Sequence, residues 1–163
     1  MPSTMKLRSS LGLVGGWGGA ILLATVAFAA TARAATLTVT NSLDRGAGSL
    51  RDALINAKDG DTIVFHPSLH GQTITLTSGG LAIRSSVDIQ GPGASVLAVS
   101  GDHKSRVFNI VKEGLTVSIA DLTITHGRGR GANGGGGILN VGSTLTLASV
   151  VLSCNEALGG GNL

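Results

Sequence analysis

A pattern of short apolar segments occurs twice in the sequence at an offset of 28 residues, and this repeat constrains the fold more than any other feature. A glycine-rich loop at 127–137 separates the two copies, and residues 155–161 begin a similar loop. A period of about 20 to 50 residues is typical of solenoids, propellers and arrays. The matching apolar positions of VSIADLTIT and LTLASVVLS are Val117 with Leu145, Ile119 with Leu147, Leu122 with Val150, and Ile124 with Leu152.

Each copy has the two-residue period of a β-strand, because its apolar residues alternate with Thr, Ser, Ala or Asp. Thr, Val, Ile and Leu favour strands, and the glycines between the segments allow tight turns. The sequence therefore predicts an all-β fold of the parallel β-helix type. In such a solenoid, coils of about 20 to 30 residues stack and bury an apolar stripe along a common axis.

Similar short segments precede the repeat. No Asn-Gly or Asp-Gly pair joins two alternating runs at the spacing of a tight hairpin, which favours parallel stacking over an antiparallel sandwich. The strands predicted before the repeat span residues 35–40, 61–65, 73–76, 81–83, 87–89, 96–99 and 107–110.

One segment, residues 49–57, has a helical period instead. Ser49 is placed to cap its N-terminus, and Gly60 is placed to end it. A short amphipathic helix of this kind would cover the open end of the first coil. Its apolar face consists of Leu50, Ala53, Leu54 and Ala57.

The first 34 residues have the pattern of a secretory signal peptide. Lys6 and Arg8 precede an uncharged apolar run at 11–32, and Ala32-Arg33-Ala34 matches a small-x-small cleavage site. We expect the mature chain to begin near Ala35. An uncleaved membrane anchor is the alternative, since the run is long enough to span a bilayer. Both interpretations predict export.

Charge and composition exclude several classes of partner. From Ala35 onward, nine basic residues balance nine acidic ones, so the basic surface that nucleic acid requires is not expected. Phe65 and Phe108 are the only aromatic residues of this part, so stacking platforms for sugars or single-stranded nucleic acid are scarce. Cys154 is the only cysteine, and an internal disulfide is therefore impossible.

Several motifs resemble a known family. The run TNSLDRGAGSLRDALINAKDGDTIVF, with LAIRSSVDIQGPG and LTVSIADLTITHGRG, resembles the start of secreted bacterial right-handed parallel β-helix proteins, which share the pectin lyase-like fold. GGGGILN and CNEALGGG are similar to the repeat elements of polymorphic outer-membrane proteins. The resemblance covers residues 35–163 and implies a secreted or cell-surface passenger, often held at the outer membrane by a C-terminal anchor or an autotransporter barrel.

We accordingly expect two parts: a signal peptide at 1–34, and a β-helix domain at 35–163 that is truncated at its C-terminal end. The sequence would then be the N-terminal fragment of a longer protein. Contact with a membrane is expected only through the signal segment or through an anchor outside this sequence.

Candidate catalytic groups are few. A lyase of this fold needs clustered carboxylates and a base, and a glycosidase needs two carboxylates at a defined separation, but no spacing singles out such a set. The favoured interpretation of Asp88 and Asp121 is that each is an outward polar residue on a half-buried strand. The residues considered for a lyase site are Asp88, Asp102, Asp121, Arg84, Lys104 and Arg106.

Histidines and the glycine loop give no stronger candidate. His126 and Cys154 occupy equivalent positions of the two copies, which indicates a tolerant turn site rather than a general base. The loop 127–137 lacks the lysine of a P-loop and the aspartates of a calcium-binding nonapeptide. Asn140 and Asn155 are expected to bond backbone groups of neighbouring coils. His66, His70 and His103 lack metal-ligand spacing.

The sequence therefore predicts an exported cell-surface or extracellular β-helix protein with a structural or adhesive role. It assigns no catalytic, cofactor-binding or metal-binding residue to this segment. The expected ligands are a host surface or a polysaccharide, and nucleic acid is not expected. The alternative is a polysaccharide-active enzyme, a lyase of the pectate-lyase type or a glycoside hydrolase, whose catalytic coils lie mostly beyond Leu163.

Overall fold

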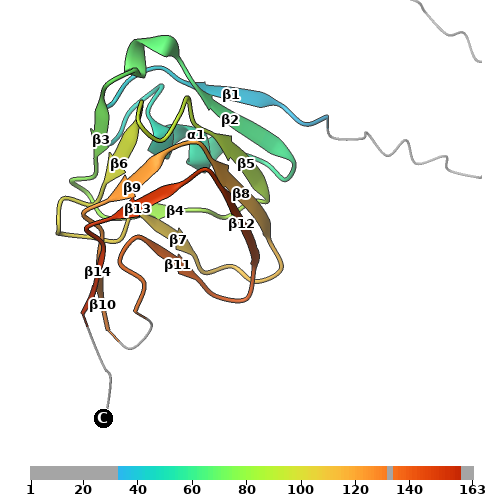
Figure 1. Cartoon of the computed structure of the whole chain (residues 1–163). Helices are drawn as coiled ribbons and strands as arrows, with labels where there is room; N and C mark the ends of the chain where they lie inside the picture. The colour runs from blue at the N-terminus through green and yellow to red at the C-terminus, as the bar shows by residue number, and fades with distance from the viewer. Residues whose placement is uncertain (1–32, 132–133, 159–163) are drawn as a thin grey trace, which may run out of the picture. The chain divides into compact units, whose positions relative to one another are not determined.

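The computed structural model describes residues 33–131 and 134–158, which form a parallel β-solenoid of about four turns (Figure 1). All ten described strand pairings are parallel. This confirms the prediction of stacked coils and excludes a sandwich of hairpins for these residues. The expected signal peptide lies almost entirely outside the described residues.

The strands assemble into three sheets and one separate pair. The five-stranded sheet has the order β1 (Thr36–Val39), β2 (Asp61–Phe65), β5 (Val87–Gln90), β8 (Thr116–Ala120), β12 (Thr144–Ala148). The four-stranded sheet has the order β13 (Val151–Ser153), β9 (Thr123–Thr125), β6 (Ala98–Ser100), β3 (Thr73–Thr75). The three-stranded sheet contains β11 (Ile138–Asn140), β7 (Phe108–Ile110) and β4 (Leu81–Ala82), and β10 (Arg128–Arg130) pairs with β14 (Glu156–Leu158).

In the last two coils, residues that are 28 positions apart in the sequence lie beside each other on neighbouring strands, as the repeat predicts. Leu147 lies beside Ile119 in the five-stranded sheet, and Leu152 lies beside Ile124 in the four-stranded sheet. Equivalent apolar positions therefore stack directly on one another. This is the physical reason for the repeat, because each aliphatic side chain completes the packing of the one in the coil below.

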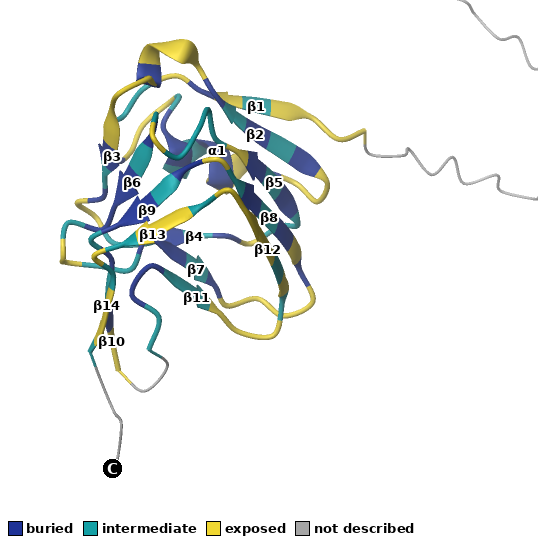
Figure 2. Ribbon diagram, in the orientation of Figure 1, coloured by how far each residue is buried: buried dark blue, intermediate teal, exposed yellow. Residues whose placement is uncertain are grey.

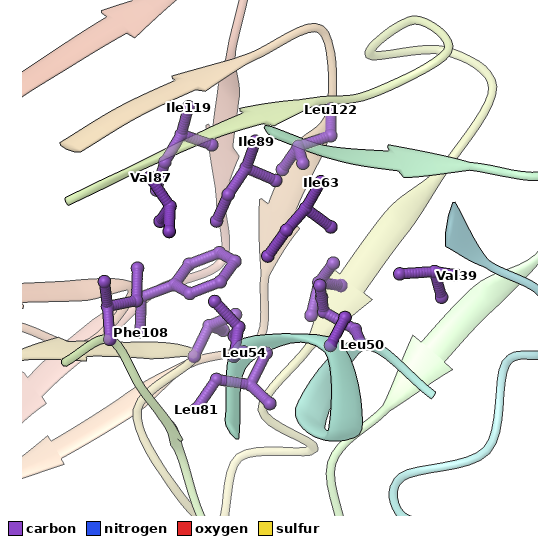
Figure 3. Packing of buried hydrophobic residues seen from close by; sticks show 14 of the residues in the cluster. Val39, Leu50, Leu54, Ile63, Leu81, Val87, Ile89, Phe108, Ile119 and Leu122 are labelled. Carbon is purple, nitrogen blue, oxygen red and sulfur yellow. The ribbon is translucent and has the colours of Figure 1, made fainter. Parts of the chain in front are cut away.

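The core is built mainly from aliphatic side chains that pack together (Figure 3), and Figure 2 shows the buried positions along the strands and α1. Ile63, Ile89 and Ile119 occupy successive strands of the five-stranded sheet in register, and all three are fully buried. Phe108 of β7 adds the only fully buried aromatic ring among the described residues. A chain that is rich in aliphatic residues and poor in aromatic ones therefore forms its core by stacking aliphatic side chains along the solenoid axis.

Helix α1 (Leu50–Asn56) confirms the one α-helix predicted from the sequence. Ser49 is its N-cap, and the Ser49 hydroxyl accepts a hydrogen bond from the Asp52 backbone N–H at 3.1 Å. Leu50, Ala53 and Leu54 are buried against the core, and the helix contacts β1 and β4. Since β1 and β4 are the edge strands of their sheets, α1 covers the first-coil end of the core, as expected.

Two parts of the fold differ from the sequence prediction. The loop at 66–71 contains a short 3₁₀ helix, η1 (Pro67–Leu69), which buries Leu69. The glycine-rich segments contain the strands β10, β11 and β14, which were predicted as turns. Gly129 of β10 shows why glycine is required, because a Cβ there would lie 2.6 Å from the carbonyl oxygens of Gly134 and Gly135. Glycine thus permits close backbone packing as well as turning.

Single residues with positive φ form the corners between sheets. Asp121 (φ 55°) joins β8 to β9, and His126 (φ 49°) joins β9 to β10. In the next coil, Ser149 (φ 52°) and Cys154 (φ 52°) take the same places. The interpretation of His126 and Cys154 as equivalent turn sites is confirmed. The placement of Asp121 on a strand face is wrong, because its left-handed backbone puts it at the corner.

No helix among residues 33–131 and 134–158 has the length and apolar character needed to cross a bilayer.

Candidate functional site

The outward face of the five-stranded sheet is the most regular polar surface of the described chain. Its strands alternate between buried core positions and more exposed outward positions, so outward residues align across the sheet. One such row, which we call the hydroxyl row, contains four hydroxyl side chains and one carboxylate. In register, it consists of Thr36, Thr62, Asp88, Ser118 and Thr146.

A shallow groove of about 410 Å³ lies over this face at β5 and β8. The Asp88 carboxylate accepts a hydrogen bond from the Gln90 amide at 2.6 Å, and the Ser86 hydroxyl accepts one from the Thr116 backbone N–H at 3.0 Å. Carboxylate, amide and hydroxyl groups can exchange hydrogen bonds with a hydroxyl-rich ligand. The lining residues are Gly60, Ser86, Val87, Asp88, Thr116 and Ser118.

The carboxylates considered for a lyase site do not form one cluster. Asp88 lies beside Ser118 in the sheet, whereas Asp121 lies at the following corner. Asp102 forms an ion pair with Lys104 at 2.6 Å. The hydrogen bond from Lys104 lowers the pKa of Asp102 below its usual value. These three carboxylates therefore have separate surroundings.

The basic candidates also have different roles. Arg106 clamps the glycine-rich loop, because its Nε donates to the carbonyl oxygens of Gly134 and Gly135, each at 3.0 Å, and its Nη2 donates to that of Arg130 at 3.0 Å. Arg84 is exposed and lies elsewhere, beside α1. Arg106 is thus a structural residue of the coil stack.

Two of the four histidines, His103 and His126, lie side by side. The rings of His103 and His126 meet edge to face, with centroids 4.5 Å apart, and the Thr125 hydroxyl contacts His126 Nδ1 at 3.0 Å. His66 instead caps η1, since its Nδ1 accepts from the Ser68 backbone N–H at 3.2 Å. Across residues 33–131 and 134–158, no group of three or more His, Cys, Asp or Glu side chains is arranged to hold a metal ion.

The expectation for the two asparagines is confirmed for one and wrong for the other. The Asn155 side chain accepts from the Gly127 backbone N–H at 2.8 Å and donates to the Ile124 carbonyl at 2.8 Å, so it joins two coils. Asn140 donates to the Ser143 carbonyl at 2.7 Å, within its own turn. The difference arises because Asn155 follows a corner that stacks on the coil below, whereas Asn140 precedes a local turn.

We predict that Asn155→Ala lowers the free energy of unfolding by about 1 to 3 kcal/mol, because backbone groups of the buried residues Gly127 and Ile124 lose their partners. Asn140→Ala is the matched control, and its effect is expected to stay below about 1 kcal/mol since its bond is exposed and local. Urea unfolding of both variants measures the difference. Equal decreases in the free energy of unfolding would show that the hydrogen bonds of Asn155 between coils contribute no more stability than the local bond of Asn140.

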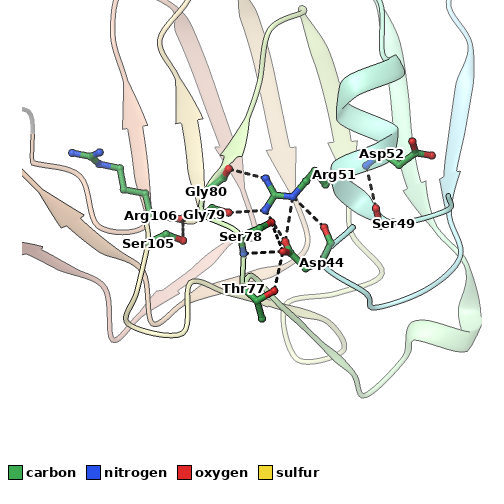
Figure 4. Close-up of polar contacts among 10 residues, drawn as sticks. All are labelled: Asp44, Ser49, Arg51, Asp52, Thr77, Ser78, Gly79, Gly80, Ser105 and Arg106. Atoms are coloured by element: carbon green, nitrogen blue, oxygen red, sulfur yellow. Dashed lines mark hydrogen bonds and ion pairs between the residues drawn. The ribbon is translucent and has the colours of Figure 1, made fainter. Parts of the chain in front are cut away.

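A polar cluster around the buried Asp44, which sequence reasoning missed, connects α1 to the next coil (Figure 4). Asp44 forms an ion pair with Arg51 at 2.6 Å and accepts hydrogen bonds from Thr77 and Ser78. Arg51 also donates to the carbonyl oxygens of Gly79 at 2.6 Å and Gly80 at 3.0 Å. We call Asp44, Arg51, Thr77 and Ser78 the helix clamp. No motif in the sequence indicated it, because its partners lie about thirty residues apart.

The last described coil exposes side chains that are buried in the coil below. Leu147 and Leu152 are 40% and 55% exposed, whereas their neighbours Ile119 and Ile124 are fully buried. β12 and β13 are the edge strands of their sheets at this end, so nothing described packs on them. The two ends of the described solenoid therefore differ: α1 covers one, and the other presents an apolar edge.

Comparisons with protein-family models, with curated proteins and with solved structures each gave no match. The class that the fold defines is a parallel β-solenoid with one capping helix. A regular polar surface of the described residues is the hydroxyl row with the groove at Asp88, and its groups can make polar contacts with a ligand.

Proposed function

We propose that the chain is an exported β-helix protein of the cell surface or extracellular space, with right-handed coils and a structural or adhesive role. The observation that carries the proposal is the hydroxyl row, in which four hydroxyl side chains and one carboxylate align across five stacked strands. Repeated outward side chains on such a stack provide an extended contact surface, as concave and lateral faces do in other solenoids. The ligands proposed are polysaccharides or host-surface components.

Export is supported by the N-terminal sequence, in which Lys6 and Arg8 precede the apolar run and Ala34 ends a cleavage pattern. We predict that the chain expressed in a bacterial host is found outside the cytoplasm with Ala35 as its first residue. Mass spectrometry of the purified protein measures this. A product that retains residues 1–34 in the membrane would support the anchor alternative, and a full-length cytoplasmic product would contradict export.

The adhesive role is tested by binding of the purified exported chain to arrayed polysaccharides and to host-cell surfaces. We expect retention on at least one of these surfaces, and we expect Ser118→Arg to reduce it at least tenfold, because the new side chain disrupts the hydroxyl row. Thr73→Arg is the matched control, since Thr73 is an exposed strand residue of the four-stranded sheet. Equal effects of the two changes would contradict a role for this face.

The same samples distinguish adhesion from catalysis. A polysaccharide-active enzyme would release new reducing ends or unsaturated products from its substrate, at a rate proportional to enzyme concentration. If the chain is adhesive, incubation with the polysaccharides that it binds should release no more reducing ends or unsaturated products than buffer alone. Turnover that survives purification would contradict the proposal and favour the alternative of a lyase or glycoside hydrolase.

A further inference from the structure

A second surface, independent of the hydroxyl row, lies between α1 and the three-stranded sheet. It is a groove of about 340 Å³, a size that falls within the range of small-molecule sites. Figure 3 shows two of its residues, Leu54 of α1 and Leu81 of β4, facing each other at the edge of the core. We call this groove the helix groove. Its lining residues are Arg51, Leu54, Ile55, Leu81, Ala82 and Arg84.

The floor and one wall of the helix groove are apolar. Leu54 and Leu81 belong to the buried core, so the groove reaches down to the aliphatic column. Ile55, on the same helix, is 74% exposed. An isoleucine this exposed, beside a concave surface with a leucine floor, provides an apolar wall that a bound hydrocarbon would cover.

Two arginines border the groove, and their charges have different surroundings. Arg51 is held by Asp44 and by the carbonyl oxygens of Gly79 and Gly80, so its charge is balanced and its position is fixed (Figure 4). Arg84 is exposed, and no carboxylate lies within ion-pair distance of it in the part of the chain that the structure describes. The groove therefore has one cation whose charge no ion pair balances.

Charged groups of both signs lie along the turn that carries Arg84. Lys112 donates to the Arg84 carbonyl oxygen at 3.1 Å, which brings a second cation to the same turn. The nearby Asp59 is engaged with the Ser86 backbone N–H at 2.7 Å and forms no ion pair with Arg84. An anion beside Arg84 would find a guanidinium that is able to donate two parallel hydrogen bonds.

We propose that the helix groove is a binding site for a small amphiphilic carboxylate, such as a medium-chain fatty acid. Its carboxylate pairs with Arg84, and its hydrocarbon body lies over Leu54 and Leu81 against Ile55. Guanidinium selects the carboxylate head, and the apolar floor selects the tail, so neither an inorganic anion nor an uncharged alkane satisfies both parts of the site.

The test is a titration of the full chain with decanoate below its micelle concentration, followed by calorimetry and by NMR of the isoleucine and leucine methyl groups. Decyltrimethylammonium, which has the same tail and a cationic head, is the ligand control. The site predicts saturable decanoate binding that shifts the methyl signals of Ile55 and Leu54, and at least tenfold weaker binding of the cation.

Arg84→Gln is expected to weaken decanoate binding about tenfold, the size of one lost charge-assisted interaction. Arg45→Gln is the matched control, because Arg45 is an exposed arginine outside the groove. Ile55→Thr, at an exposed helix position, is expected to weaken binding severalfold without unfolding the chain. Equal affinity of wild type and Arg84→Gln, equal binding of the cation, or no saturable binding would each overturn the proposal.

Discussion

Replacing Phe108 with alanine is expected to lower the free energy of unfolding by about 3 to 5 kcal/mol. Phe108 is fully buried at the start of β7, and it pairs in register with Leu81 on one side and with Ile138 on the other (Figure 3). It is the largest fully buried side chain of a core that is built mainly from aliphatic side chains, with Phe65 as the other aromatic member. Removal of the ring leaves a cavity that stacked strands cannot close without losing their register.

The loss is measured by urea unfolding of wild type and Phe108→Ala at one protein concentration. Val111→Ala is the control, because Val111 directly follows β7 and is 59% exposed, and its effect should stay within about 0.5 kcal/mol. A loss below about 1 kcal/mol at Phe108 would mean that the ring is not packed in a closed core.

Replacing Asp44 with asparagine is expected to lower the free energy of unfolding by about 2 to 4 kcal/mol, because Arg51 loses its counter-charge in a largely buried place. The change also weakens the bonds that Thr77 and Ser78 donate to the carboxylate. Since the helix clamp attaches α1 to the next coil, this end of the core should open first. Hydrogen exchange of the α1 amides, compared between wild type and the variant, reports that opening.

The pH dependence of the helix clamp gives an independent check. Burial would raise the pKa of Asp44, but hydrogen bonds from Ser78, Arg51 and Thr77 outweigh burial and lower it from 3.8 to about 2. A carboxyl with a lowered pKa stabilises the fold fully above 3.8, and this stabilisation is lost as the pH falls toward 2. The lost stabilisation amounts to about 2 kcal/mol, at about 1.4 kcal/mol per pKa unit.

Other carboxyls titrate in the same direction, so the variant is needed to isolate Asp44. Hydrogen bonds from the backbone N–H groups of Lys58 and Ala35 lower the pKa of Asp61. The difference in unfolding free energy between wild type and Asp44→Asn should therefore be measured at each pH. It is expected to shrink between pH 3.8 and about 2. A difference that stays constant over this range would contradict the ionised clamp.

The repeat and the helix were predictable because each depends on a local pattern. The aliphatic positions at 117, 119, 145 and 147 alternate with small polar residues, and the same alternation sets which side chains enter the core. Helix α1 was predictable because Ser49 and the apolar face occur within one short segment. In both cases the local preference and the long-range packing agree, so sequence reasoning needed no tertiary information.

The strands in the glycine-rich segments were not predictable, because their strand conformation comes from the neighbouring coil. Arg128 to Arg130 contains no β-branched residue, yet it pairs with Glu156 to Leu158 in register. The helix clamp was missed for a related reason. Asp44 and Arg51 precede or enter α1, but the groups that complete the cluster belong to the next coil, at Ser78 and Gly79.

The sequence predicted the overall charge of the candidate surfaces, but it did not predict which residues form them. The lack of a strongly basic surface follows from the nine basic and nine acidic residues that balance from Ala35 onward. The alignment of Asp88 with Ser118 depends on a register between coils that contain different numbers of residues. The helix groove depends on the angle at which α1 meets β4, which no sequence spacing records.

Parallel stacking of the coils is tested most directly by paired cysteines on the outward face of β8 and β12, introduced into a Cys154→Ser background. Thr116 lies beside Thr144, and Ala120 lies beside Ala148. Adjacent strands are about 4.8 Å apart, which is within reach of a disulfide, whereas positions four residues out of step are separated by about 13 Å along the strand. The account predicts rapid oxidation of the pairs 116–144 and 120–148. Preferential oxidation of the crossed pairs 116–148 and 120–144 would show antiparallel neighbours and contradict it.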